Sequence, residues 1–404
     1  MPKTKIETTE ETTSSARRGA RGANVQHVLD VLRSDGPSSQ AAIARRTGLA
    51  PATVNNIVQA LRADGVADVQ WINGREALVQ LVPKQGAIVS ICAGPESVQG
   101  SVFNFAKGTR TNRTRKLLKD DRPGASPEAA IELIRTLAGD AGVAVSDLAG
   151  VSIAIQAPID RVSGSIAPWA ANRMPVWRNV PIAQVIKEAL GVPVVVDNDA
   201  NLAALAEWTW GTGRGSDCFL YVTCSGGIGG GLVIDGKIHH GGNGMALEIG
   251  HIVIEQTGPV CFCGSRGCLS TLASERSILA ALQGSESPKR SLVEVIESAK
   301  DGDPACQRVL YEAGRNLGRA LANMSKILAP SVVAVGGVLS EAGPLVFDSL
   351  HSSIEENNVP AFCPSIKFKR ALIADATSLG GVAAIMSELG QGVSELPGWM
   401  GAAS

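Results

Sequence analysis

The sequence predicts an α/β protein in which a small helix-rich domain precedes a larger domain with two lobes around a cleft. Three observations support this. Apolar residues recur at helical spacing over residues 24–63. Strand-like and helix-like segments alternate from about residue 83 onward. A histidine and three cysteines lie close together within residues 251–268. A length of 404 residues suits two or three domains.

The composition is that of an ordinary globular chain, with 45% hydrophobic and 19% charged residues. The formal net charge is -1, so contact with nucleic acid would need a local basic patch. There is no apolar run of about 18 residues, and the first residues are polar, which argues against a membrane span or a secretion signal. We therefore expect a cytoplasmic protein, in which clustered cysteines favour metal binding over disulfides.

The predicted domains are residues 1–22, 23–82 and 83–404. Residues 1–22 are rich in Thr, Glu, Ser, Arg and Gly without apolar periodicity, so we expect a disordered tail. The arginines near its end fit either a basic arm or a solubilising segment.

The small domain should contain three helices and a hairpin. A first helix runs from Asn24 to the Gly36-Pro37 breaker, and a short second one, capped by Ser38 or Ser39, ends at Gly48. A third helix follows from about residue 49. Alternating residues around Asn73-Gly74 predict a β-hairpin. This order is that of a winged helix-turn-helix.

The other face of the third helix carries short amides and a hydroxyl, which can reach base edges in a major groove. Between residues 16 and 63 there are seven arginines and two aspartates, a local excess that phosphate contact requires. A three-helix protein-interaction module is the alternative. The candidate DNA contacts are Arg45, Arg46, Thr53, Asn55, Asn56, Gln59 and Arg75.

The large domain should alternate strands and helices. Helices are expected at 126–142, 201–211, 311–328 and 378–388, and strands at 87–94, 98–105, 150–158, 191–200 and 331–339, with a glycine-broken hairpin at 218–238. The glycine turns at 225–231 and 336–337 are weak phosphate-site signals, because glycine also serves hairpins and tight packing.

One strand ends in polar residues. The buried valine run before Asp197, Asn198 and Asp199 puts carboxylates at the carboxyl end of a strand, where α/β folds bind ligands. Asp199 could instead serve only as the cap of the following helix.

The histidine and cysteines form a candidate metal site. His251, Cys261, Cys263 and Cys268 supply one nitrogen and three thiolates, a set that suits tetrahedral Zn²⁺. Four protein ligands leave no open position, so the zinc would be structural. A redox centre or unconnected thiols are the alternative.

These stretches together resemble the ROK family (repressors, open reading frames and kinases) over residues 24–388, and within it the sugar-responsive repressors that carry an N-terminal winged helix-turn-helix. The most specific motif is the family's zinc signature, which stands here as GH…CFCGSRGCL. The resemblance implies a two-lobed actin-like, sugar-kinase-like fold with a structural zinc and a homodimeric or homotetrameric assembly.

The resemblance also implies a sugar site. In the family, residues matching Asn198, Asp199, Glu248 and His251 bind the sugar hydroxyls, and Asn172 is a further candidate for this effector site. In kinase members the aspartate matching Asp199 is the general base. We expect it to be vestigial here.

The chain departs from the kinase pattern. Cys92, Pro95 and Glu96 replace the aspartate, the second glycine and the threonine of the kinase phosphate loop, so this loop should not support ATP. SGGIG at 225–229 lacks the usual threonine, and Ser270 replaces a sugar-binding glutamate.

The prediction is a sequence-specific DNA-binding repressor of carbohydrate-metabolism genes, controlled by a sugar or sugar phosphate and bound to a palindromic operator. One alternative is an ATP-dependent sugar kinase with an additional DNA-binding role. Another is a DNA-binding protein whose cleft only supports folding and dimerisation.

Overall fold

The computed structural model describes residues 23–32, 35, 38–63, 66–72, 76–81, 86–117, 125–284, 288–357, 366–389, 391 and 395–401. The predicted tail, residues 1–22, lies outside this range. The chain divides into two compact units, residues 1–85 with 386–396 and residues 86–385 with 397–404. Within the described residues, no helix is long and apolar enough to cross a membrane.

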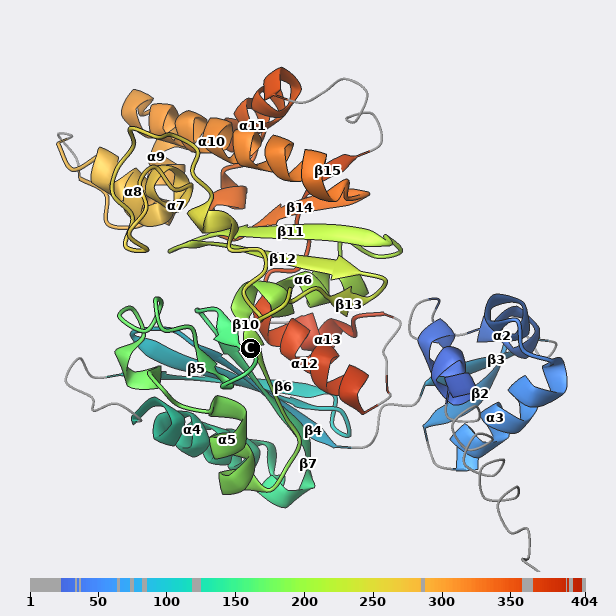
Figure 1. The fold of residues 1–404 in the computed structure, drawn as a ribbon. Helices are drawn as coiled ribbons and strands as arrows, with labels where there is room; N and C mark the ends of the chain where they lie inside the picture. Colours follow the sequence, from blue (N-terminus) through green and yellow to red (C-terminus); the bar gives the residue numbers. More distant parts are fainter. Residues whose placement is uncertain are drawn as a thin grey trace, which may run out of the picture. The chain divides into compact units, whose positions relative to one another are not determined.

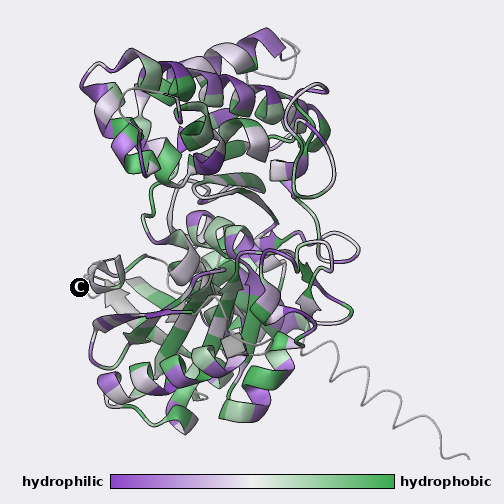
Figure 2. Ribbon diagram, turned by 90° about the vertical axis from the view of Figure 1, so that its left-hand side faces the viewer, coloured by the Kyte–Doolittle hydropathy of each residue, from purple (hydrophilic) through white to green (hydrophobic). Residues whose placement is uncertain are grey.

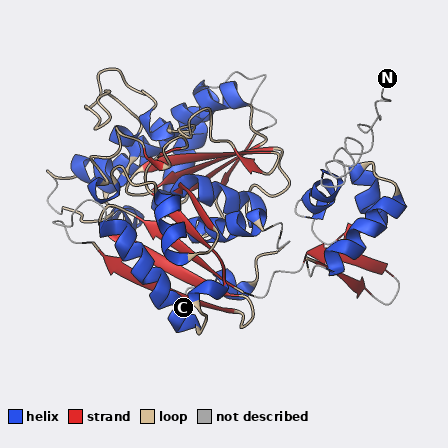
Figure 3. Ribbon diagram, turned by 60° about the horizontal axis from the view of Figure 1, so that its bottom comes forward, coloured by secondary structure: helices blue, strands red, loops and turns tan. Residues whose placement is uncertain are grey.

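The first unit is a winged helix-turn-helix, as predicted (Figure 3). Its core contains Val28, Ile43 and Val79 with almost no exposed surface. The Ser39 hydroxyl caps the second helix by accepting a 3.3 Å hydrogen bond from the amide of Ala42. The described elements are a helix at 23–32, α2 (Gln40–Thr47), α3 (Pro51–Ala63) and an antiparallel sheet of order β1-β3-β2, from β1 (Ser38–Ser39), β2 (Ala67–Ile72) and β3 (Glu76–Leu81).

The first sheet of the second unit has the order β10-β7-β4-β5-β6. Strands β4, β5 and β6 are antiparallel neighbours, whereas β7 and β10 run parallel to β4. Strands β4, β7 and β10 therefore end at the same edge of the sheet. Helices α4 and α5 contribute to the core on one face of the sheet. The bounds are β4 (Ala87–Ala93), β5 (Ser97–Asn104), β6 (Thr109–Lys116), α4 (Ala125–Ala141), β7 (Leu148–Ile155), α5 (Ile182–Leu190) and β10 (Val194–Asn198).

The second sheet has the order β13-β12-β11-β14-β15, and α9 and α10 pack on one of its faces (Figure 1). Helix α11 lies along α10. The bounds are β11 (Cys218–Cys224), β12 (Ile228–Ile234), β13 (Lys237–Ile238), α7 (Ser270–Ala273), α8 (Glu275–Ala281), α9 (Leu292–Lys300), α10 (Pro304–Leu328), β14 (Val332–Gly336), α11 (Pro344–Asn357) and β15 (Lys367–Arg370).

Two helices lie between the sheets, α6 (Asp199–Trp210) and α12 (Ala376–Glu388) (Figure 1). Residues 200–207 of α6 are all buried, as expected for a helix packed on every side. Gly231 of β12 permits this approach, because a Cβ there would lie 2.6 Å from the Ala200 carbonyl oxygen. A Cβ on Gly380 of α12 would overlap the Leu202 carbonyl. The α6 backbone is thus held from both sides by glycines.

Shorter elements complete the second unit. The strands β8 (Ile159–Asp160) and β9 (Ser165–Ile166) form a two-stranded ribbon, and the helix α13 (Gly398–Gly401) follows α12. Figure 2 shows mostly hydrophobic strands within the unit and helices that alternate hydrophobic and hydrophilic residues. This is the expected pattern for helices that cover a sheet and face solvent on their other side.

Candidate effector and metal sites

The four predicted zinc ligands come together in space. Their ligand atoms, one from each of His251, Cys261, Cys263 and Cys268, all lie within 4.8 Å of one another. The Nδ1 atom of His251 is 3.5 Å from the Cys261 sulfur, and the sulfurs of Cys263 and Cys268 are 3.7 Å apart. With Zn–S bonds of about 2.3 Å, a tetrahedral site has S···S edges of about 3.8 Å. The cluster therefore fits a zinc ion.

The local fold explains this convergence. The segment doubles back on itself through isolated bridges between Val253 and Cys268 and between Val260 and Arg266. Gly267 has a φ of 64° and sits so close to Glu255 that a Cβ would overlap the Glu255 carbonyl. No residue with a side chain fits there, so this glycine is required to bring Cys268 back to Cys261.

The sugar candidates Asn198 and Asp199 lie where β10 enters α6. The Asn198 side chain caps this helix, because its Oδ1 accepts from the amides of Ala200 at 2.9 Å and Asn201 at 3.4 Å. Its Nδ2 donates to the carbonyl of Ala157 at 3.2 Å. The structure thus gives Asn198 a capping role.

Asp199 presents a carboxyl group at the start of α6. Burial raises its pKa to about 6, while a hydrogen bond from the amide of Ala200 acts in the opposite direction. Ionising this carboxyl is costly because it is buried. It can be protonated or ionised near neutral pH, so it can donate a hydrogen bond to a ligand hydroxyl or accept one from it.

Glu248 is electrostatically coupled to Asp199. Burial, and then the charge of Asp199, raises the pKa of Glu248 to about 7. Glu248 directly precedes the 3-10 turn Ile249–His251, so it shares one backbone turn with a zinc-ligand candidate. We call this pair of carboxyls, Asp199 and Glu248, the polar wall; carboxyls of this kind are able to form hydrogen bonds with adjacent hydroxyls of a ligand.

Sequence reasoning missed a pair that supports this wall. The Oδ2 of Asp197 is 2.6 Å from Nε2 of His240, and its Oδ1 accepts from Asn201 Nδ2 at 2.8 Å. His240 lies between β13 and Glu248, so the pair ties the loop that carries Glu248 to the end of β10. Asp197 was visible in the sequence, but its partner lies 43 residues away and is set by the tertiary fold.

The loop before η2 (Pro175–Trp177) also reaches the zinc cluster. Trp169 packs edge-on against His251, with ring centroids 5.1 Å apart, and lies nearly parallel to Phe262 at 6.2 Å. The guanidinium of Arg173 lies 4.6 Å from the Phe262 ring centre. Asn172 is exposed, and its Oδ1 accepts from Arg178 at 2.6 Å. Sugar contact by Asn172 stays a prediction.

The degenerate phosphate loop joins β4 to β5. Cys92 is hydrogen-bonded to Ser378 at 3.6 Å, and burial raises its pKa to about 12, so the thiol is neutral. Pro95 and Glu96 lie in the exposed turn. In the second glycine loop, Glu275 places a carboxylate oxygen 4.0 Å from where a Cβ on Gly226 would stand. A carboxylate there opposes a chain of nucleotide phosphates.

The DNA-contact candidates lie on α2 and α3. Arg45, Arg46, Asn56 and Gln59 are exposed, and Thr53 and Asn55 are half-buried. The Nε of Arg46 pairs with Asp35 at 3.1 Å. Arg75 lies outside the described residues.

Comparison with known proteins agrees with this geometry. A model of the ROK family matches residues 88–388. The chain belongs to the ROK family. A winged helix-turn-helix DNA-binding model matches residues 24–67 of this ROK protein, which therefore carries a DNA-binding domain.

Two kinds of ROK protein are similar to this chain. The xylose repressor of Bacillus subtilis is 28% identical over 336 residues, covering 82% of this chain and 86% of the repressor. The xylose repressor of Caldicellulosiruptor bescii is 28% identical over 334 residues, covering 78% of this chain and 82% of the repressor. A glucokinase of Thermotoga maritima is 33% identical over 255 residues, covering 59% of this chain and 80% of the kinase. The alignments with the two repressors thus cover more of this chain than the alignment with the glucokinase does.

Solved structures show the same fold. A ROK family transcriptional regulator, a homologue of the E. coli MLC protein, superposes with a TM-score of 0.77 at 23% identity, covering 92% of this chain and 97% of that one. A ROK hexokinase from Thermus thermophilus gives a TM-score of 0.62 at 30% identity, covering 75% of this chain and 99% of that one.

Proposed function

We propose that this ROK protein is a transcriptional repressor of carbohydrate-metabolism genes that responds to a sugar or sugar phosphate. The observation that carries the proposal is the pairing of two features. Asp199 and Glu248 form a polar wall of the kind that binds hydroxyls, and a winged helix-turn-helix stands in the same chain. The similarity to xylose repressors over about four-fifths of the chain supports it.

The sugar ligand would act by binding two conformations of the protein with different affinities. Asp199 lies at the start of α6 between the sheets, whereas Glu248 belongs to the segment after β13. A ligand held by both carboxyls joins the two parts of the unit and favours the closed arrangement. The operator affinity then changes only to the extent that the ligand binds the two conformations differently.

A bound zinc ion would hold the segment that carries Glu248 in a fixed conformation. His251, Cys261, Cys263 and Cys268 would hold the ion, which supplies a four-coordinate cross-link. With Nδ1 of His251 directed at Cys261, the Nε2 of the same ring is left for a ligand hydroxyl. Because Glu248 precedes this turn, the cross-link fixes the position of its carboxyl.

Oligomerisation belongs to the same proposal. A single winged module gives modest affinity, and a homodimer or homotetramer on a palindromic operator multiplies it. A cytoplasmic location follows from the proposed contact with DNA.

The test is binding to DNA from upstream of the protein's own gene, measured by gel shift with and without sugars and sugar phosphates. A specific shift that one of these compounds abolishes or strengthens supports the proposal. A specific shift that none of them changes would favour a cleft that serves only as a scaffold.

A sugar kinase with an additional DNA-binding role is the second candidate, favoured by the 33% identity to a glucokinase. Cys92 in the first loop and Glu275 beside the second argue against it. Release of ADP from ATP with any sugar of the same panel would establish the kinase.

A further inference from the structure

The second unit has two lobes, each with a hydrophobic core of its own. The first lobe is built on the sheet β10-β7-β4-β5-β6 and the second on the sheet β13-β12-β11-β14-β15. The core of the first lobe includes Ala170 and Met174, in the loop before η2. The core of the second lobe includes Ile249 and Leu269, on either side of residues 251–268, which we call the zinc loop. The zinc loop and the loop before η2 thus belong to different lobes.

These two loops meet in a cluster of aromatic rings. Trp169 packs on the core of the first lobe and contacts His251 of the second, with ring centroids 5.1 Å apart and ring planes at 86°. The Phe262 ring lies edge-on to His251 at 5.0 Å and nearly parallel to Trp169 at 6.2 Å. The guanidinium of Arg173 lies over the Phe262 ring, 4.6 Å from its centre. We call Trp169, Arg173, His251 and Phe262 the aromatic clasp.

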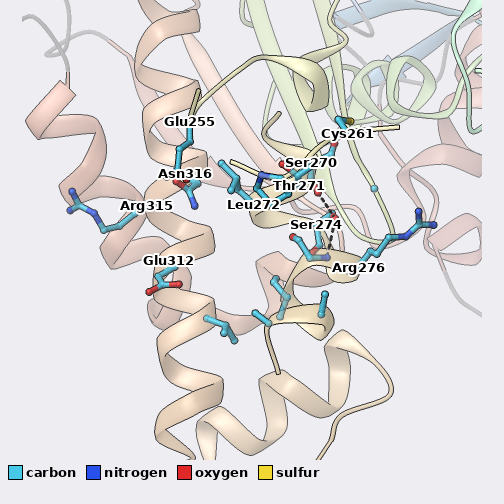
Figure 4. A pocket seen from close by; sticks show the side chains of 18 of the residues that line it. Glu255, Cys261, Ser270, Thr271, Leu272, Ser274, Arg276, Glu312, Arg315 and Asn316 are labelled. Atoms are coloured by element: carbon cyan, nitrogen blue, oxygen red, sulfur yellow. Dashed lines mark hydrogen bonds between the residues drawn. The ribbon is translucent and has the colours of Figure 1, made fainter. Parts of the chain in front are cut away.

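One side of the clasp is open to solvent. Phe262 keeps 45% of its surface exposed. Together with Arg173 it lines a pocket of about 1020 Å³ that lies between the α7–α8 segment and α10 (Figure 4). Aromatic and cation–π contacts at such exposed positions are individually weak. The clasp can therefore open while the core of each lobe stays intact.

The lobes touch at a second place, beside the β8–β9 ribbon. Arg161 follows β8 in the first lobe, and its amide donates a 3.2 Å hydrogen bond to the carbonyl of Asn243, which follows β13 in the second. A Cβ on the neighbouring Gly244 would lie 2.3 Å from the carbonyl oxygen of Ile159, so the two segments are in close contact. In the sequence, Glu248 lies between this contact and the zinc loop.

We propose that Trp169 is a positioning residue, which holds the two lobes together at the effector site through the aromatic clasp. For the effector, this inference rests on the proposed function. Asp199 directly follows β10 of the first lobe, whereas Glu248 precedes the zinc loop of the second. A ligand that bonds to both carboxyls therefore requires the lobes to be together. When only a fraction of the molecules has this arrangement, the apparent affinity for the ligand falls by that fraction.

Hydrogen–deuterium exchange of the full-length protein, measured by mass spectrometry, tests the clasp without a ligand. The reporter is the peptide that contains Arg161, whose amide is bonded across the lobes. In Trp169→Ala and in Phe262→Ala we expect this peptide to exchange about 10-fold faster than in the wild type. Because the two variants lie in different lobes, a shared effect reports separation of the lobes and not a local change beside Trp169.

Two further variants serve as controls for the exchange experiment. Trp169→Phe keeps an aromatic ring in the clasp, so exchange should stay within about threefold of the wild type. Trp399→Ala is the matched control, because Trp399 also packs edge-on against an aromatic ring, that of Phe105 at 5.4 Å, but within the first lobe. It should change exchange at Arg161 by less than about twofold.

The gel shift with sugars and sugar phosphates then tests the consequence for the effector. The concentration of the active compound that half-maximally changes operator binding should rise about 10-fold in Trp169→Ala. It should stay within about threefold of the wild type in Trp169→Phe and Trp399→Ala. Circular dichroism and zinc content establish that each variant is folded and keeps its zinc, as expected for side chains that are not ligands.

The outcomes separate this inference from the proposed function. If Arg161 exchanges at the wild-type rate in Trp169→Ala, or if Phe262→Ala leaves it unchanged, the inference is overturned while the sensor function stands. An unchanged half-maximal concentration in Trp169→Ala also overturns it. If no compound changes operator binding of the wild type, the proposed function fails, and the exchange rates alone decide whether the clasp holds the lobes together.

Discussion

At the scale of single residues, the site depends on carboxyls that the fold makes costly to ionise. Asp199 has a pKa of about 6 in the folded protein, against 3.8 without burial. Between these pH values the folded protein holds a proton that the unfolded chain has lost. The free energy of unfolding therefore falls as the pH rises through that window, and it stays lower at higher pH.

Asp199→Asn removes this ionisation. We expect the variant to be more stable than the wild type at pH 8, by about 1–3 kcal/mol, since each pKa unit corresponds to about 1.4 kcal/mol and solvent access reduces the effect. The difference should shrink toward pH 4. Urea denaturation at several pH values measures it, and a difference that does not change with pH would contradict the pKa shift. The same variant should lose effector response.

The four candidate zinc ligands allow a prediction that does not depend on DNA contact. Cys263→Ser replaces a thiolate by a hydroxyl, a poor zinc ligand, and should reduce bound zinc from one equivalent per chain. We expect a lower melting temperature and a weaker response to the effector. The matched control is Cys306→Ser, at a buried cysteine in α10, which should keep its zinc. A zinc-free Cys263→Ser with wild-type melting and response would exclude a structural role for the ion.

At the scale of elements, a buried carboxylate fixes the connection into α12. Glu207 of α6 is fully buried, and its two oxygens accept from the amides of Thr212 at 2.8 Å and of Leu372 and Ile373, both at 2.7 Å. The link joins the end of α6 to the segment between β15 and α12. No periodicity in the sequence distinguishes this glutamate from an exposed helical one.

Glu207→Ala would leave the buried amide of Thr212 and the partly exposed amides of Leu372 and Ile373 without their acceptor. We expect a loss of about 2–4 kcal/mol in the free energy of unfolding, because an unsatisfied buried donor costs about 1–3 kcal/mol and water can reach the other two amides. Glu188→Ala, at an exposed glutamate of α5, is the control and should change stability by less than about 0.5 kcal/mol. Urea denaturation midpoints of both variants measure this. A wild-type midpoint in Glu207→Ala would show that water replaces the carboxylate.

The elements also show what the sequence can and cannot predict. The helix-turn-helix, the hairpin of β11 and β12, and the strands β4, β5, β7, β10 and β14 follow from apolar periodicity and glycine turns. Strand β6, TRTNRTRK, was not predicted, because it is an exposed edge strand without apolar alternation. Strand β15, KFKR, is similarly polar, and among the described strands it pairs only with β14.

The residues of the candidate sites also include some that the sequence predicts and some that it does not. His251, Cys261, Cys263 and Cys268 lie within one local motif, so the spacing alone predicts their convergence. The pairing of Asp197 with His240, and the approach of Trp169 and Arg173 to Phe262, depend on how distant segments pack. Such contacts carry no local signal.

At the scale of the whole molecule, the proposed function requires the helix-turn-helix to recognise DNA. Asn56 of α3 is exposed, and an amide of this kind can pair with an adenine edge. We expect Asn56→Ala to weaken binding to the specific operator by about 1–3 kcal/mol and to leave non-specific binding unchanged. Gln26→Ala, on the preceding helix and bonded to Asp30 at 2.9 Å, is the control. Fluorescence anisotropy with specific and random duplexes measures both, and equal losses on the two duplexes would exclude a base contact.

The glycines around α6 have a mechanical consequence. With the β12 backbone against one side of the helix and α12 against the other, α6 has no slack in which to slide sideways. We therefore expect a rearrangement of the two sheets to proceed by rotation about α6 and not by a sideways shift of this helix. Asp199 is the first residue of α6, so a ligand bound to its carboxyl would contact the element about which the sheets turn.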